Sequence, residues 1–283
     1  MTQKQANLIL ATVSLVWGLS YLFMKLGVDG IPPSTMVALR CGIAFVITGI
    51  IFMNKMVKIS AKALLYSSIA GALLFGIFVL LIYGVEHTSA TSAGFLTSTT
   101  VIMVPILQAI LNRKFPAPKI VFGVMIVSFG LLLLTVRDQF AIDVGAIYCL
   151  IAALLYAIHI IVSNRFVREV DALQLGILQL GFAAFLATVC TFVFEEPVLP
   201  STPIHWGAIL GLALICSAYG FVMQSVAQKY TTPESVGFLF SLEPIFSAIF
   251  AFIFLKESIG LTGYLGATLI LIGVFIANRD FKK

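Results

Sequence analysis

The chain consists of long apolar segments separated by short polar ones. Each apolar segment has about the 20 residues that a helix needs to cross a bilayer. The segments are too long and continuous for barrel strands, and they lack the alternation typical of such strands. Helices, which satisfy their own backbone hydrogen bonds in lipid, are therefore expected. Ten spans are predicted: Asn7–Leu26, Ser34–Met53, Ala63–Val85, Thr88–Leu111, Lys119–Val136, Val144–Ser163, Ala172–Phe194, Ile204–Ala227, Pro233–Leu255 and Ile259–Ala277.

Basic residues are distributed unequally between the two ends of these spans. Lys and Arg accumulate in cytoplasmic loops of membrane proteins. The side that carries both termini holds 13 of them, the opposite side holds 3 (Lys25, Arg137 and Lys256), and Arg40 lies inside a span. This asymmetry predicts a multi-pass protein of the inner or plasma membrane with cytoplasmic N- and C-termini. The 13 are Lys4, Lys55, Lys58, Lys62, Arg113, Lys114, Lys119, Arg165, Arg168, Lys229, Arg279, Lys282 and Lys283.

Composition agrees with a membrane location. Hydrophobic residues make up 60% of the 283 residues and charged residues only 10%, whereas soluble domains carry about 25% charged residues. The net charge of +5 is dispersed among the apolar segments, so a nucleic-acid partner is not expected. The expected surroundings are a lipid bilayer, and no segment is left over for a separate soluble domain.

The chain contains a weak internal repeat. Gly94–Leu96 recurs as Gly237–Leu239, at an offset of 143 in the numbering, and two further glycine pairs share that offset. Nearer the start of each half the offset is 139, which aligns Trp17 with Tyr156 and Arg40 with Gln179. Five spans per half is an odd number, so the second half enters the membrane inverted, as in many transporters. We predict an all-α integral membrane fold of two inverted five-helix repeats, residues 1–138 and 139–283.

Several motifs resemble one known family. Ser14–Lys25 contains Trp17-Gly18 followed by a lysine, and this segment is similar to the first helix of the EamA-type drug/metabolite transporters. The resemblance extends to Arg40 and to Phe240–Pro244 with the later glycines. It implies a ten-helix bundle whose fifth and tenth helices lie at the periphery. One departure is Lys114, which occupies the position of a glutamate that the family has there, although its repeat mate Glu257 is retained.

Glu243 is the one acid predicted deep in a span. A charge at that depth costs about 2.5–3.5 kcal/mol on insertion scales, so it is expected to face a cavity or a partner. It is a candidate coupling acid or a counter-charge for a substrate amine; a hydrogen bond across helices, or a fixed pair with Arg40, is the alternative. Arg40 itself could bind a substrate carboxylate, snorkel outward or cap carbonyls.

A central cavity is expected between the two repeats, with an aromatic wall and a few polar groups. His159 could relay protons or simply be hydrogen-bonded within the bundle. Pro105 and Pro244 are expected to bend the fourth and ninth spans. The predicted cavity residues are Trp17, Ser20, Tyr21, Arg40, Tyr83, Thr97, Ser98, Tyr156, His159, Gln179, Tyr219, Gln224 and Ser241.

No nucleotide-binding loop and no catalytic or metal-binding motif occurs in the sequence. We therefore expect no cofactor, no metal and no enzymatic activity. The predicted function is secondary transport of small organic metabolites, amino acids or related compounds, by alternating access and in the direction of export. The alternatives are an intramembrane enzyme that acts on a lipid-linked substrate and a membrane protein without transport activity. Export is preferred over import, but the sequence leaves the direction of transport open, together with substrate identity, coupling ion and oligomeric state.

Overall fold

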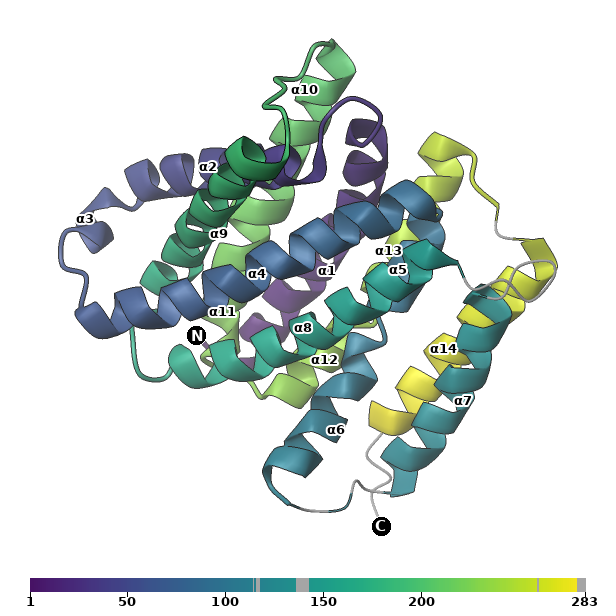
Figure 1. Cartoon of the computed structure of the whole chain (residues 1–283). Coiled ribbons are helices and arrows are strands. Elements are labelled where there is room, and N and C mark those ends of the chain that lie inside the picture. The colour runs from purple at the N-terminus through teal and green to yellow at the C-terminus, as the bar shows by residue number, and fades with distance from the viewer. Residues whose placement is uncertain (114, 116–117, 136–142, 259, 279–283) are drawn as a thin grey trace.

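The computed structural model describes residues 1–283 except 114, 116–117, 136–142, 259 and 279–283. The described residues form helices joined by short loops and contain no strand (Figure 1). The first half contains α1 (Gln3–Gly27), α2 (Pro33–Ile51), α3 (Met53–Met56), α4 (Ala61–His87), α5 (Ala90–Thr97), α6 (Thr100–Leu111) and α7 (Pro118–Thr135). The second half contains α8 (Val144–Phe166), α9 (Ala172–Phe194), α10 (Pro203–Leu210), η2 (Gly211–Tyr219), α11 (Gly220–Gln228), α12 (Pro233–Phe240), α13 (Glu243–Phe250), η3 (Ala251–Leu255) and α14 (Gly260–Asn278).

The helices are long and apolar enough for a membrane protein. Seven helical segments of the described chain have the length and hydropathy to cross a bilayer, among them the combined segments Ala90–Leu111 and Pro203–Gln228. Three shorter apolar helices, Val121–Gly130, Glu243–Leu255 and Gly260–Ile276, lie within the fifth, ninth and tenth predicted spans. The prediction of an all-helical integral membrane protein is confirmed. The count of ten spans stays a prediction.

Side-chain caps explain where several helices begin. The Thr2 hydroxyl accepts a hydrogen bond from the Gln5 amide while the Gln5 side chain bonds back to the Thr2 amide, which forms a capping box. Ser60 and Ser89 accept from amides in the first turns of α4 and α5, and Asp171 does so for α9. These caps satisfy amides that have no partner inside the helix.

The two halves make corresponding contacts. α1 packs against η2 and α11 of the second half, and its counterpart α8 packs against α4 of the first half. The counterparts α2 and α9 pack against one another. The main contacts therefore run between the halves, and the space between α1, α4, α8 and α11 becomes the centre of the molecule.

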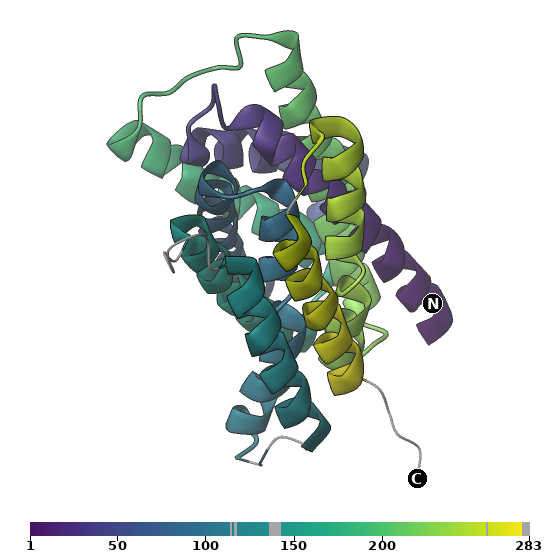
Figure 2. The same ribbon diagram turned by 90° about the vertical axis from the view of Figure 1, so that its right-hand side faces the viewer.

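Two helices lie together at one edge of the bundle, α7 and α14, side by side in both views (Figures 1 and 2). Glycines let their backbones approach closely. A Cβ atom on Gly130 would lie 2.7 Å from the Gly266 carbonyl oxygen, and one on Gly273 would lie 2.7 Å from that of Gly123. The glycines that share the offset of 143 in the sequence thus form the contact between the two helices.

The fourth and ninth predicted spans are each interrupted. α5 and α6 are separated by Ser98 and Thr99, and α12 and α13 are separated by the repeat mates of these two, Ser241 and Leu242. Pro105 lies inside α6, as expected for a bend. Pro244 differs from the expectation, because it occupies the first turn of α13 rather than the interior of a continuous helix. At that position a proline removes no helical hydrogen bond, and the interruption precedes it.

Two side chains at corresponding positions, one near the end of α1 and one near the end of α8, donate hydrogen bonds to backbone carbonyl oxygens. Lys25 Nζ, at the end of α1, donates to the carbonyl oxygens of Val85 and Thr88 at 2.8 and 3.0 Å. Asn164 Nδ2, at the end of α8, donates to those of Gln228 and Thr231 at 3.1 and 3.2 Å. The donors are related by the offset of 139, and each pair of acceptors is related by the offset of 143.

Candidate functional site

A small cavity lies between α1, α2, α4, α5, α8, α11 and α13. Its volume is about 30 Å³, which is room for about one or two water molecules. A metabolite can enter this space only if the surrounding helices move apart. The cavity is lined by Trp17, Ser20, Tyr21, Met24, Arg40, Ile77, Phe78, Leu81, Thr97, Tyr156, Phe221 and Glu243.

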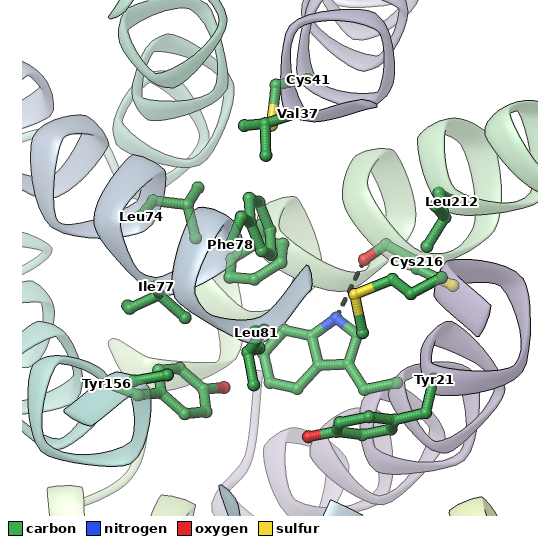
Figure 3. Close-up of a cluster of buried hydrophobic side chains, with 14 of the residues drawn as sticks. Tyr21, Val37, Cys41, Leu74, Ile77, Phe78, Leu81, Tyr156, Leu212 and Cys216 are labelled. Atoms are coloured by element: carbon green, nitrogen blue, oxygen red, sulfur yellow. Dashed lines mark hydrogen bonds between the residues drawn. The ribbon is translucent and has the colours of Figure 1, made fainter. Parts of the chain in front are cut away.

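Aromatic rings from both halves line the cavity and form what we call its aromatic wall; Figure 3 shows three of these side chains, Tyr21, Phe78 and Tyr156. The Trp17 ring centroid lies 5.7 Å from that of Tyr156 in an edge-on arrangement and 4.7 Å from that of Phe221. Gly220 leaves the space that the indole occupies, because a Cβ atom there would overlap Trp17 Nε1. The indole nitrogen donates to the Cys216 carbonyl oxygen at 2.9 Å. Cys216 belongs to the π-helical segment η2, and such segments are frequent at functional sites.

Arg40 is a buried cation at this cavity. Its side chain is 1% exposed, Nε donates to Ser217 Oγ at 3.0 Å, and the guanidinium lies 3.9 Å from the Phe78 ring centroid. Nη1 is buried and has no hydrogen-bond partner among the described residues. The side chain does not snorkel to a membrane surface. Nη1 of the guanidinium can therefore still donate a hydrogen bond, which a carboxylate could accept.

Glu243 begins α13 and is 7% exposed. Its Oε1 accepts a hydrogen bond of 2.8 Å from the Tyr21 hydroxyl. In the described part of the chain no carboxylate oxygen lies close enough to an Arg40 nitrogen to form an ion pair. The expected alternative of a fixed Arg40–Glu243 pair is therefore absent, although both groups line the same cavity.

His159 lies beside the cavity, with its ring centroid 6.1 Å from that of Tyr156. Its Nε2 lies 2.9 Å from Gln179 Oε1, and Gln179 Nε2 donates to Ser225 Oγ at 3.2 Å. His159 Nδ1 is buried and has no partner within the described residues. His159 and Gln179 thus belong to a polar chain that adjoins the aromatic wall.

The structure brings together only part of the predicted set. Trp17, Ser20, Tyr21, Arg40, Thr97, Tyr156 and Glu243 line the cavity. His159 lies next to the lining residue Tyr156, and Gln179 is hydrogen-bonded to His159. The other members, Tyr83, Ser98, Tyr219, Gln224 and Ser241, are not among the lining residues.

Two of these tyrosines point elsewhere. The Tyr83 ring lies 5.7 Å from that of Tyr148, and Tyr219 is 38% exposed with its hydroxyl 2.6 Å from Thr12 Oγ1. Ser98 Oγ, just after the end of α5, donates to the Phe95 carbonyl oxygen of that helix. Gln224 is fully buried in α11, one turn after the lining residue Phe221.

The five lining residues absent from the predicted set are all apolar: Met24, Ile77, Phe78, Leu81 and Phe221. The repeat could have identified two of them, because Phe78 and Phe221 are repeat mates at the offset of 143 and their rings pack edge-on at 5.3 Å. Lys114, whose position carries a glutamate in the resembled family, and Arg137 lie outside the described residues.

A solved crystal structure superposes on this chain with a TM-score of 0.72 at 19% sequence identity, covering 97% of this chain and 96% of the other. An uncharacterized transporter of Archaeoglobus fulgidus is 27% identical over 273 residues, which cover 96% of this chain and 85% of the relative. The uncharacterized transporter YoaV of Bacillus subtilis is 27% identical over 283 residues, which cover 96% of each chain.

The family model of the EamA-like transporters matches residues 4–136 and again residues 143–279. These two matches account for nearly the whole chain. With its membrane-spanning helices, the protein is a multi-pass membrane protein of a transporter family, and a small-molecule substrate and a lipid bilayer are its implied partners. The chain belongs to the EamA-like transporter family.

Proposed function

We propose that this protein exports small zwitterionic metabolites, amino acids or related compounds, across the cell membrane by alternating access. The observation that carries the proposal is the placement of Arg40 and Glu243 on one cavity without pairing with one another. A buried charge is costly unless it is compensated. A substrate carboxylate at Arg40 and a substrate ammonium at Glu243 would compensate both charges at once.

The proposed architecture is ten spans in two inverted halves, residues 1–138 and 139–283, with the substrate site between them. Three structural correspondences support it. The interruptions of the fourth and ninth spans, the Lys25 and Asn164 hydrogen bonds, and the glycine contacts of α7 and α14 all follow the offsets of the sequence repeat. Rocking one half against the other would open the cavity to either side in turn.

The aromatic wall favours substrates that carry an apolar or aromatic part beside the charged groups. Trp17, Tyr156, Phe78 and Phe221 offer ring faces and edges close to the two charges. Aromatic side chains in such a wall contribute apolar contact and specific ring geometry. We therefore expect aromatic and large aliphatic amino acids to bind better than small polar ones.

Counterflow of labelled amino acids in proteoliposomes tests the proposal. Purified protein is expected to show saturable exchange of zwitterionic amino acids and no exchange of the matching amines or carboxylic acids that lack one charge. Arg40→Gln should reduce exchange about tenfold or more, because a charge-assisted hydrogen bond is roughly twice as strong as a neutral one. Exposed Arg165→Gln is the matched control. Exchange of an amine and an amino acid at equal rates would contradict the zwitterion proposal.

A further inference from the structure

Two glutamine side chains of α11 are buried without a partner among the described residues. Gln224 and Gln228 are 0% exposed, and neither the side-chain oxygen nor the side-chain nitrogen of either residue has a hydrogen-bond partner in that part of the chain. Buried amides are costly unless they are hydrogen-bonded. Water commonly supplies the missing partner where protein groups do not.

The two amides extend from the cavity towards one end of the bundle. Gln224 and Gln228 follow the lining residue Phe221 by one and two helical turns, a spacing that places all three on one face of the helix. α11 packs against α8, where Tyr156 Oη and His159 Nδ1 are also buried and unpartnered among the described residues. The row ends where Asn164 binds the Gln228 carbonyl oxygen.

The corresponding row in the first half is apolar. The repeat mates of Gln224 and Gln228, at the offset of 143, are Leu81 and Val85 of α4. Both are buried, at 6% and 0% exposure, and the Val85 carbonyl oxygen accepts from Lys25 as that of Gln228 accepts from Asn164. The two rows thus have the same place in the fold and opposite chemistry.

We propose that Gln224 and Gln228 bind a row of water molecules that joins the cavity to the end of the bundle at the C-termini of α8 and α11. In the repeat-related row, Leu81 still lines the cavity, and beyond it Val85 excludes water. On this side a polar group of a substrate, or a proton, can leave the cavity while it remains hydrogen-bonded. On the opposite side, a polar group can leave the cavity only if apolar side chains separate, so the two exits from the cavity differ in chemistry. This proposal extends alternating access, and its test needs no substrate, so it can fail while the transport proposal stands.

Cysteine reactivity tests the proposal with Val85, the repeat mate of Gln228, as the matched control. Gln224→Cys, Gln228→Cys and Val85→Cys are made singly in a chain whose four native cysteines, Cys41, Cys149, Cys190 and Cys216, are replaced. The probe is 2-aminoethyl methanethiosulfonate, a small hydrophilic cation, added to protein in detergent so that both ends of the bundle are accessible. The two α11 positions should react at least tenfold faster than position 85 of α4. Equal rates, or faster reaction at α4, would overturn the proposal.

A second measurement keeps the native amides in the reference protein. Ser163→Cys, on α8 beside Asn164, reports reagent entry along the same route, since Ser163 is 1% exposed and its hydroxyl lies 3.4 Å from His159 Nε2. Adding Gln224→Leu and Gln228→Leu removes the water-binding groups at similar side-chain volume. The reaction at position 163 should slow at least tenfold, while Arg168→Cys at the surface reacts unchanged. An unchanged rate at position 163 would refute the hydrated route.

Discussion

At the residue scale, the bundle contains buried polar groups that have few or no hydrogen-bond partners among the described residues. These groups distinguish it from a helical core that serves packing alone. Arg40 is compensated by a serine hydroxyl and an aromatic face but leaves Nη1 free of partners among those residues. Glu243 has the Tyr21 hydroxyl as a partner. Groups of this kind are tolerated in membrane spans mainly at functional positions. Both side chains are therefore candidates for roles in transport.

We predict that Glu243→Gln abolishes uphill transport driven by a pH gradient and preserves folding. Downhill exchange should be reduced but still measurable, because the neutral amide no longer compensates the charge of the substrate ammonium. The amide can still accept the Tyr21 hydrogen bond, whereas it cannot exchange a proton between the two open states. Uphill uptake and counterflow are measured in the same proteoliposomes. Glu196→Gln, an exposed acid outside the cavity, should transport normally. Undiminished uphill transport in Glu243→Gln would reduce the carboxylate to a structural hydrogen-bond partner.

A surface carboxylate should make stability depend on pH. Glu169, in the loop between α8 and α9, accepts hydrogen bonds from Lys62 Nζ and from the Tyr66 hydroxyl, each at 2.7 Å. The Lys62 hydrogen bond, helped by that of Tyr66, lowers the pKa of this carboxyl below its usual value. Its contribution to stability is therefore present above the usual carboxyl pKa of roughly 4.3 and is lost as the pH falls through the lowered value.

Glu169→Gln should accordingly unfold at a slightly lower temperature than the unchanged chain at pH 7. The difference should shrink once the pH is below the usual carboxyl range. Thermal unfolding in detergent at both pH values measures it, with Glu196→Gln as the control that lacks these partners. A difference that is the same at both pH values would contradict the linkage.

At the element scale, small residues and interrupted helices shape the bundle. α7 and α14 meet at glycines, which permit backbone contact that larger side chains prevent. The interruptions between α5 and α6 and between α12 and α13 lie next to the cavity residues Thr97 and Glu243. Irregular backbone at membrane depth is tolerated where it is enclosed by protein or lines a cavity. The peripheral helices α7 and α14 therefore form a packing contact, whereas the interrupted spans border the cavity.

We predict that Gly130→Ala and Gly273→Ala each destabilise the protein by about 1–3 kcal/mol, the usual range for overpacking. The added methyl would lie within 3.0 Å of backbone atoms of the partner helix, which cannot move independently. Gly49→Ala is the matched control, since a Cβ there meets nothing within 4 Å. Thermal unfolding in detergent compares the three variants. Equal midpoints for all three would show that α7 and α14 separate without cost.

At the scale of the whole molecule, the two halves are matched in their contacts and unmatched in their chemistry. The Lys25 and Asn164 hydrogen bonds occupy corresponding places at the ends of α1 and α8. Lys25 is a cation and Asn164 is a neutral amide. The neighbouring row of α4, Leu81 and Val85, is apolar, whereas the row of α11, Gln224 and Gln228, is polar. A transporter whose two open states need different stabilities in an asymmetric membrane can use such differences.

The orientation of the molecule is tested with cysteines placed singly at loop positions in a chain without its native cysteines. Lys58→Cys and Arg168→Cys should resist an impermeant thiol reagent in intact cells, because the 13-to-3 distribution of basic residues predicts that they lie in the cytoplasm. Glu196→Cys, in the loop on the opposite side, should be labelled. Labelling of the first two and protection of the third would reverse the predicted topology.

The sequence by itself determined the class of the protein and showed the repeat on which the proposed two-fold architecture rests. Apolar segments of membrane-spanning length predict helices because no other structure satisfies its backbone in lipid. The pairs Gly123 with Gly266 and Gly130 with Gly273 are visible as a repeat and become the contact of α7 with α14. Trp17 and Tyr156, aligned by the repeat, touch in the structure.

The tertiary structure alone decided which side chains face the cavity. Tyr21 lines it, whereas Tyr219 is 38% exposed, although both lie on apolar helices. The sequence pattern does not distinguish the two positions, because in lipid the outer face of a helix is as apolar as its inner face. The carbonyl groups that accept hydrogen bonds from Lys25 and Asn164 could not be predicted from the sequence either. Every residue carries such a carbonyl, and only the packing of helices from both halves determines which ones meet a donor.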